Sequence, residues 1–191
     1  MSLFIVRHAE TDGNAARVFQ SASAPLSEAG HLQAAQLARR MAATGVARIV
    51  SSDYLRAMQT ASIVSERVGV TIETEPILRE RDFGDLCGLS YDSLIANPFD
   101  PSYSPPNGED RATFLARIAL AWGRISELAA QTQGNLLVVT HGQVCRALVE
   151  QHLRLKVGES LPPNWANTSV TEVESTPPWQ ARRVNCVAHL R

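Results

Sequence analysis

Two short stretches of uninterrupted apolar residues, Leu3–Val6 and Leu136–Val139, are the feature that most constrains the fold of this chain. A strand that is apolar on both faces is typical of the centre of a parallel sheet, because helices cover such a sheet on both sides. Both stretches are therefore expected to be central strands. Further strands are expected at Arg48–Val50, Thr71–Leu78, Val170–Glu174 and Trp179–Val187, the last two as an antiparallel hairpin at the edge of the sheet.

Between the expected strands, apolar side chains recur at the three- and four-residue spacing of an amphipathic helix. Ser27 is expected to cap the first helix, Gly45 to end it, and the sequence SSD at 51–53 to cap the second. The last helix is expected to run on through the HLRLK segment at 152–156. The four apolar stripes are Ala34, Leu37, Ala38 and Met41; Ala57, Ala61, Val64 and Val68; Phe114, Ile118, Ala121, Ile125 and Leu128; and Val144 and Leu148.

The alternation of strands and helices predicts a three-layer α/β/α sandwich with a mainly parallel sheet and an antiparallel edge strand. The 191 residues suit one domain, and no repeat or linker divides them, so residues 1–191 are expected to form a single domain. Residues 91–110 interrupt the alternation and contain four of the ten prolines. This irregular excursion is expected to form a lid over the functional site.

Charge and composition argue against several classes of protein. The formal net charge is −1 and there is no dense run of lysine and arginine, so neither nucleic acid nor an anionic membrane is an expected partner. The first apolar run is too short for a signal-peptide core or a membrane span. The cysteines Cys87, Cys145 and Cys186 are widely spaced and include no CxxC pair, which favours a cytoplasmic protein without a disulfide framework.

Reactive or anion-binding side chains follow four of the expected strands. The carboxyl ends of parallel strands lie at one edge of a sheet, next to the amino ends of the following helices, and ligands bind there. These side chains are therefore expected to share one pocket. They are Arg7, His8, Arg56, Glu80 and His141, the last followed by Gly142.

Two arginines, two histidines and one carboxylate are the groups that phosphoryl transfer to a nitrogen atom requires. Guanidinium groups hold the phosphate oxygens, and a neutral imidazole attacks phosphorus in line with the leaving group. A carboxylic acid then protonates the leaving alkoxide, and the same group can activate the water that hydrolyses the phosphohistidine. Because there is no HExxH motif, paired aspartate motif or Cys/His cluster, neither a metal ion nor another cofactor is expected.

Four segments together resemble the signature segments of the histidine phosphatase superfamily, which includes phosphoglycerate mutases and many small phosphatases. They are FIVRHAETDGN, SSDYLRAMQTA, LRERDFGDLCGL and VVTHGQVCRAL, and the resemblance extends from residue 3 to the VNCVAHL tail. It implies the fold predicted above and catalysis through a phosphohistidine. Because this chain is short, it is more similar to the small phosphatases of the family than to the mutases.

Carried over by position, the resemblance makes His8 the phosphorylated nucleophile and Glu80 the proton donor, with Asp82 as the alternative donor. The same carry-over implies two further groups of residues. The phosphate-binding group is Arg7, Asn14, Arg56, His141 and Gly142, and the group with further substrate contacts is Gln20, Ser21 and Glu109.

Simpler interpretations exist for some of these positions. Glu80 lies in the segment RERD, which can be a charged turn with exposed ion pairs. Glu109 can complement the dipole of the helix that follows it. Ala9 stands where the family usually has glycine, and if the backbone there needs a positive φ, the alanine would strain the loop that presents His8.

The predicted function is a phosphomonoesterase that hydrolyses a small phosphorylated metabolite, so the expected partner is a small-molecule phosphate ester. Phosphoglycerate mutase-type phosphoryl transfer is the first alternative, because Arg81 follows Glu80 as it does in the mutases. It ranks second because residues 91–110 contain no lysine or arginine with which to retain a doubly phosphorylated ligand. A non-catalytic module that binds phosphate esters is the second alternative. A homodimer is left open.

Overall fold

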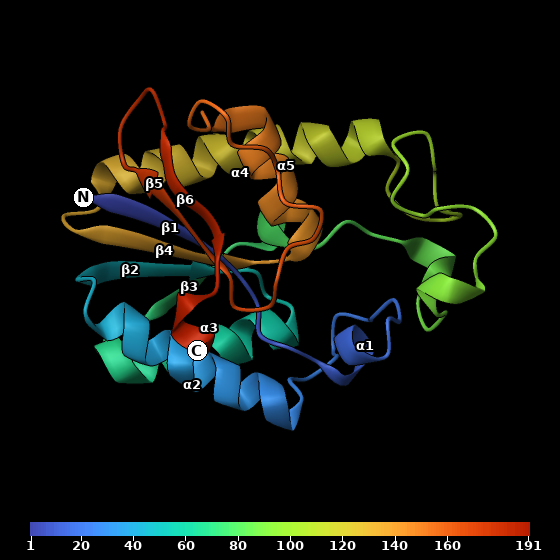
Figure 1. Ribbon diagram of the computed structural model, residues 1–191, viewed down its shortest axis with the longest axis horizontal. Helices are drawn as coiled ribbons and strands as arrows, with labels where there is room; N and C mark the ends of the chain where they lie inside the picture. Colours follow the sequence, from blue (N-terminus) through green and yellow to red (C-terminus); the bar gives the residue numbers. More distant parts are fainter.

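A six-stranded sheet forms the centre of the protein in the computed structural model, which describes residues 1–191 (Figure 1). The strands are β1 Ser2–Arg7, β2 Val46–Ser51, β3 Ile72–Thr74, β4 Asn135–Thr140, β5 Val170–Glu174 and β6 Ala181–Cys186. Their order in the sheet is β3-β2-β4-β1-β5-β6. The first four strands are parallel, and β5 and β6 run antiparallel at one edge. The predicted fold class is confirmed.

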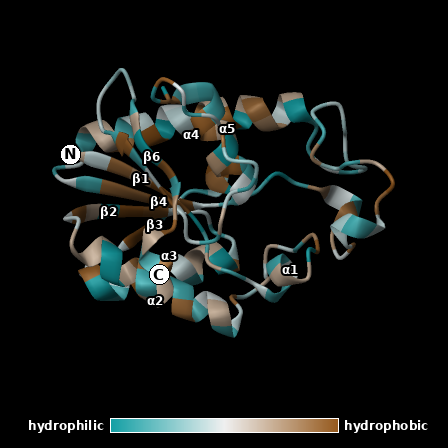
Figure 2. Cartoon of the chain, in the orientation of Figure 1, coloured by the Kyte–Doolittle hydropathy of each residue, from teal (hydrophilic) through white to brown (hydrophobic).

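Helices cover both faces of the sheet. Helices α2 Glu28–Ala42 and α3 Leu55–Val68 cover one face, and α4 Arg111–Gln131 and α5 Gly142–His152 cover the other. The short helix α1 Asp12–Ala15 has no buried residue and lies beyond the carboxyl edge of the sheet (Figure 1). Because successive side chains of a strand point to opposite faces, Leu3 and Ile5 pack with the stripes of α4 and α5, whereas Phe4 and Val6 pack with those of α2 and α3. Figure 2 shows the resulting hydrophobic sheet between helices of mixed hydropathy.

The register of the two central strands places the ends of both at the same level. β1 and β4 are neighbours, and Arg7 pairs with Thr140 at their carboxyl ends. His8 and His141, one residue beyond each strand, therefore leave the sheet side by side. The backbone amide of His8 continues the ladder by donating to the Thr140 carbonyl at 2.8 Å.

Two expected elements are shorter than predicted. The extended stretch Thr71–Leu78 is a strand only at Ile72–Thr74, and Pro76–Leu78 form a 3-10 turn. Proline lacks the amide that a sheet ladder needs, and its fixed φ suits the first position of a helical turn. The last helix ends at His152 instead of continuing through HLRLK, because the backbone of Arg154 bonds to the segment that leads into β6.

The expected helix boundaries were correct at one point and wrong at another. Ser27 caps α2 through its side-chain oxygen, as predicted. Gly45 adopts a φ of +67° in the turn that leads from α2 to β2, three residues after the helix has ended. The SSD segment does not cap α3: Tyr54 is the N-cap residue and makes no side-chain cap bond, while Asp53 pairs with Arg79.

Residues 91–110 project beyond the carboxyl edge of the sheet (Figure 1). Apart from a 3-10 turn at Tyr91–Ser93 they form turns and irregular chain. An aromatic cluster consisting of Phe19, Phe83, Tyr91 and Phe99 joins them to the loops after β1 and β3, with ring centroids 4.5–6.0 Å apart. None of the helices combines the length and hydrophobicity that crossing a membrane requires.

Candidate active site

A cleft of about 750 Å³ lies at the carboxyl edge of the sheet, bounded on one side by the excursion. His141 is fully buried and does not reach its surface, and Glu109 lies outside its wall. No group of three or more His, Cys, Asp or Glu side chains is arranged to hold a metal ion. Eight of the ten predicted site residues line the cleft: Arg7, His8, Asn14, Gln20, Ser21, Arg56, Glu80 and Gly142.

The imidazole of His8 is held in one orientation. Its Nδ1 lies 2.7 Å from the carbonyl oxygen of Ala9. Because a carbonyl oxygen only accepts hydrogen bonds, we assign the ring proton to Nδ1, which leaves the lone pair on Nε2. Nε2 accepts a hydrogen bond from Nε of Arg56 at 3.2 Å, and His8 as a whole is only 2% exposed. The ring therefore presents a nucleophilic nitrogen next to a cation.

Ala9 does not strain this loop. It is not among the non-glycine residues with positive φ. Its methyl group is fully buried against Leu26 and Ala34, and its amide donates to Thr60 Oγ1 at 3.0 Å. The alanine that stands in place of the family's usual glycine is therefore compatible with the orientation of His8.

Burial and neighbouring cations keep both site histidines neutral. Desolvation is the main cause that holds the pKa of His8 well below its ordinary value of 6.5, and the positive charges of Arg56 and Arg7 lower it further. The same two effects hold the pKa of His141 well below 6.5. A neutral imidazole is the form that can attack phosphorus.

The same shifts predict how stability depends on pH. We expect the free energy of unfolding to fall by roughly 1 kcal/mol per buried histidine between about pH 7.5 and about pH 5.5. The unfolded chain takes up protons at an ordinary pKa near 6.5 that the folded chain does not bind, so the stabilisation present above that pH is lost below it. Urea unfolding at a series of pH values measures this slope. His8→Asn should make it shallower and the exposed control His31→Gln should not; equal slopes for wild type and His8→Asn would contradict the prediction.

Arg7 and Arg56 bring two guanidinium groups to His8. Arg56 lies in the first turn of α3 and is 3% exposed. Arg7 ends β1 and donates through Nη1 to the Trp165 carbonyl, while its buried Nε has no partner. Burial lowers the pKa of both arginines, and the charge of Glu80 opposes that shift. Since guanidinium groups stay protonated in proteins, both are desolvated cations that suit a bound oxyanion.

His141 is the N-cap residue of α5, and its ring centroid lies 5.1 Å from that of His8. Its Nε2 lies 2.8 Å from Ser52 Oγ. Its Nδ1 is buried and has no hydrogen-bond partner. Leaving a buried polar atom unpaired costs about 1–3 kcal/mol, so a phosphate oxygen that reached Nδ1 would restore that loss.

Asn14 and Gly142 each leave donors available at the cleft. Asn14 Oδ1 accepts from the Thr11 amide at 3.2 Å and from Asn167 Nδ2 at 3.1 Å, so its own NH₂ group remains free to donate to an anion. Gly142 opens α5, where the first amides have no partner within the helix. Arg7 Nε lies close to this glycine, 3.4 Å from where a Cβ atom would be, an ordinary van der Waals distance.

Gln20 and Ser21 line the cleft but are partly engaged within the protein. Gln20 Oε1 accepts from the Thr11 hydroxyl. The Ser21 carbonyl accepts from Arg56 Nη1 at 2.9 Å, so Ser21 helps to hold this arginine in place. Their predicted substrate contacts remain predictions.

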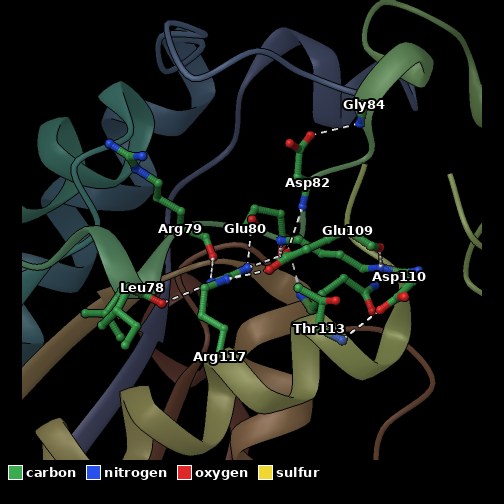
Figure 3. A network of polar contacts seen from close by, with 12 residues as sticks. Leu78, Arg79, Glu80, Asp82, Gly84, Glu109, Asp110, Thr113 and Arg117 are labelled. Atoms are coloured by element: carbon green, nitrogen blue, oxygen red, sulfur yellow. Dashed lines mark hydrogen bonds and ion pairs between the residues drawn. The ribbon is translucent and has the colours of Figure 1, made fainter. Parts of the chain in front are cut away.

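The carboxylate of Glu80 lies against the amino end of α5. Its Oε2 accepts from the Gln143 amide at 3.2 Å, and its Oε1 accepts from the Arg81 amide at 3.0 Å. The alternative donor, Asp82, also lines the cleft, but its Oδ1 accepts from the Gly84 amide at 2.8 Å and its carboxylate points away from Glu80 (Figure 3). This geometry favours Glu80 over Asp82.

Glu109 does not line the cleft. Its carboxylate forms a two-pronged ion pair with Arg117, with both N–O distances 2.7 Å (Figure 3). The cap of α4 is Asp110, whose Oδ1 accepts from the Thr113 amide at 2.7 Å. The expected substrate contact of Glu109 is therefore not supported, because the side chain is committed to Arg117.

Sequence reasoning missed most of the charge on the cleft wall. Six arginines line the cleft against three acidic residues. Arg81, Arg111 and Arg146 reach it from elements other than the excursion, and only Arg81 could have been found in advance, from its position next to Glu80. The aromatic cluster and Asn167 also line the cleft, and they come from separate loops that show no pattern along the chain.

Comparison with known proteins identifies the family of this chain. Residues 3–186 match the model of the histidine phosphatase superfamily (branch 1). The chain is 32% identical over 194 residues to GpmB, a probable phosphoglycerate mutase from Yersinia pestis, and the match covers 95% of this chain and 88% of that protein.

Solved structures of phosphatases and mutases have the same fold. A mycobacterial glucosyl-3-phosphoglycerate phosphatase, in complex with VO3, is 28% identical with a TM-score of 0.83, covering 97% of this chain and 99% of that one. Bacillus stearothermophilus YhfR is 28% identical with a TM-score of 0.84, covering 100% and 99%. The phosphoglycerate mutase of Bacillus anthracis is 25% identical with a TM-score of 0.84, covering 100% and 95%. This chain belongs to the histidine phosphatase superfamily.

Proposed function

We propose that this protein is a phosphomonoesterase that hydrolyses a small phosphorylated metabolite through a covalent phosphohistidine at His8, with Glu80 as the proton donor. One observation carries the proposal: the neutral imidazole of His8 lines the cleft with Nδ1–H held by the Ala9 carbonyl, and its unprotonated Nε2 accepts from Arg56, a phosphate-binding group. An imidazole in this state can form a bond to phosphorus without first losing a proton.

The residues account for both halves of the reaction. Arg7 and Arg56 hold the phosphate oxygens while His8 Nε2 forms the bond to phosphorus and the ester P–O bond breaks. Glu80 gives its proton to the departing oxygen. A water molecule then attacks phosphorus, Glu80 takes up a proton from it, and the P–N bond breaks with its electron pair returning to Nε2. The positive charge on phosphohistidine is supported by the Nδ1–H bond to Ala9.

Release of nitrophenolate from p-nitrophenyl phosphate in the presence of a metal chelator tests the proposal directly. We expect turnover to be unaffected by the chelator, because the two buried arginines supply the charge that a metal ion would otherwise provide. Absence of turnover in this assay, together with tight binding of phosphate, would support the non-catalytic binding module instead. If p-nitrophenyl phosphate is turned over, phosphate release from a panel of phosphorylated metabolites would define the natural substrate.

Phosphoglycerate mutase activity is the second candidate. The observation that favours it is the arginine-lined cleft, because Arg81, Arg111 and Arg146 supply the positive charge that the excursion lacks. The 32% identity to GpmB points the same way. Incubation with 3-phosphoglycerate separates the candidates: a phosphatase releases inorganic phosphate, whereas a mutase forms 2-phosphoglycerate.

Replacing Arg56 with alanine is expected to weaken vanadate binding roughly 10- to 100-fold, the range that corresponds to loss of a charged hydrogen bond. Isothermal titration calorimetry of the apo protein with vanadate measures the change. Arg67→Ala is the matched control, because Arg67 is an exposed arginine in the last turn of the same helix. Unchanged affinity in Arg56→Ala would remove this residue from the phosphate site.

A further inference from the structure

The ion pair between Glu109 and Arg117 lies behind the cleft and does not line it. Arg117 projects from α4, and Glu109 is the second residue before that helix begins. Both side chains are largely buried, with 21% and 14% of their surface exposed for Arg117 and Glu109 respectively. A buried, two-pronged guanidinium–carboxylate pair fixes direction as well as distance.

Arg117 uses its remaining hydrogen-bonding capacity on the segment that leads to Glu80. Its Nη1 donates to the carbonyl of Ile77 at 2.9 Å. Nη1 also donates to the carbonyl of Arg79 at 2.8 Å, and Nη2 donates to that of Glu80 at 3.3 Å (Figure 3). The intervening carbonyl, that of Leu78, accepts from the Thr140 hydroxyl at 2.7 Å. Side chains therefore hold four consecutive carbonyls of a segment that has already left the sheet.

Glu109 holds the chain on the other side of Glu80. Its Oε2 accepts from the Asp82 amide at 3.2 Å, and its own amide donates to the Asp82 carbonyl at 2.8 Å. Its carbonyl accepts from Arg81 Nε at 3.0 Å. The backbone is thus clamped immediately before and immediately after Glu80, and the Glu80 side chain reaches from this clamped backbone to the amino end of α5 and to the cleft.

We propose that the Glu109–Arg117 pair is a positioning device that sets the carboxylate of Glu80 over the reacting ester, an inference that rests on the proposed role of Glu80 as proton donor. Neither residue touches the substrate. Their effect is confined to the geometry of proton transfer, because a displaced carboxylate cannot deliver its proton to the leaving oxygen. The phosphate-binding groups around His8 come from other elements and make no hydrogen bond to this pair.

The test uses Arg117→Ala and Arg117→Lys in the whole chain of residues 1–191. We expect Arg117→Ala to slow phosphorylation by an alkyl phosphate about 100-fold and by p-nitrophenyl phosphate less than about 5-fold, since nitrophenolate leaves without full protonation. Affinity for vanadate should not change. Arg117→Lys keeps the charge but not the fork, so we expect an intermediate loss, and it replaces the alanine variant if that protein does not fold.

Two controls separate positioning from a general structural role. Arg124→Ala removes another ion-paired arginine of α4, the partner of Glu75, and should leave the ratio of alkyl to aryl rates unchanged. In a double-mutant cycle, adding Arg117→Ala to Glu80→Gln should cost much less than Arg117→Ala alone, because both changes remove the same proton transfer.

A further measurement does not depend on catalysis. The Gln143 amide donates to Glu80 Oε2, so we expect its hydrogen exchange to become at least about tenfold faster in Arg117→Ala and not in Arg124→Ala. Unchanged exchange at Gln143 would overturn the proposal. A different outcome would be faster exchange at Gln143 in Arg117→Ala with an unchanged ratio of alkyl to aryl rates in both Arg117→Ala and Glu80→Gln. That result would show that Glu80 is not the proton donor. The proposed function would then fail at this step, and the catalytic part of the inference would fail with it.

Discussion

Replacing His8 with alanine is expected to lower the turnover of every phosphate ester by at least about 10⁴-fold, since loss of the attacking group removes the covalent route. The structure leaves Nε2 unprotonated at the cleft, where it accepts from Arg56 Nε, so this nitrogen should carry the phosphoryl group once a phosphate takes over the Arg56 donor. Rapid acid-free quenching of the reaction with radiolabelled substrate should trap a label on wild-type protein that is stable to alkali and lost in acid. The variant should carry none.

Two other histidine variants serve as controls for this experiment. His31→Ala removes an exposed histidine of α2 and should leave both label and turnover unchanged. His141→Ala should slow formation of the label without removing its site, because its ring lies beside His8 and does not reach the cleft surface. Label at the wild-type level in His8→Ala would show that the nucleophile lies elsewhere.

Glu80→Gln is expected to produce the second-largest loss of activity, and the loss should be larger for alkyl phosphates than for aryl phosphates. Loss of the proton donor should slow phosphorylation by an alkyl phosphate by about 10²- to 10³-fold, within the range of general acid catalysis. With p-nitrophenyl phosphate the loss should be less than about 10-fold, because that leaving group needs little protonation. Single-turnover rates across a series of esters should therefore depend more steeply on leaving-group pKa in the variant than in the wild type.

Asp82→Asn is the matched variant, because it also removes a carboxylate that lines the cleft two residues away. It should leave the dependence on leaving-group pKa as it is in the wild type, since the Asp82 carboxylate is bonded to the Gly84 amide. Equal slowing of alkyl and aryl esters in Glu80→Gln would mean that Glu80 orients the phosphate or the loop. A selective loss in Asp82→Asn would transfer the role of proton donor to Asp82.

The central part of the fold could be predicted from local sequence because each of its strands and helices has a recognisable pattern of apolar residues. Continuous apolar runs indicate strands that are covered on both faces, and the helical stripes indicate the covering helices. Once Leu3–Val6 and Leu136–Val139 are neighbouring parallel strands, the residues that follow them must meet at one edge. The proximity of His8 to His141 follows from that rule alone.

Segments whose polar groups bond to partners far along the chain were predicted less well. Asp53 belongs to a sequence that can cap α3, but it pairs with Arg79. The HLRLK segment has helical periodicity, but backbone bonds from Arg154 to the segment that leads into β6 end the helix at His152. In both cases a partner far along the chain competes with a local preference and prevails, as tertiary contacts commonly do over propensity.

The sequence by itself determined which reactive side chains follow which strands. An arginine and a histidine follow the first strand, an arginine lies in the helix after the second, an acidic residue follows the third, and a histidine follows the fourth. Only the tertiary structure decided how these groups are held. Burial keeps His8 neutral, and the Ala9 carbonyl chooses which of its nitrogens is nucleophilic. Arg117, forty residues away in sequence from Ile77, clamps the segment that carries Glu80. The charge state, tautomer and orientation of a side chain depend on groups that meet only when the chain has folded. No local sequence pattern encodes these three properties.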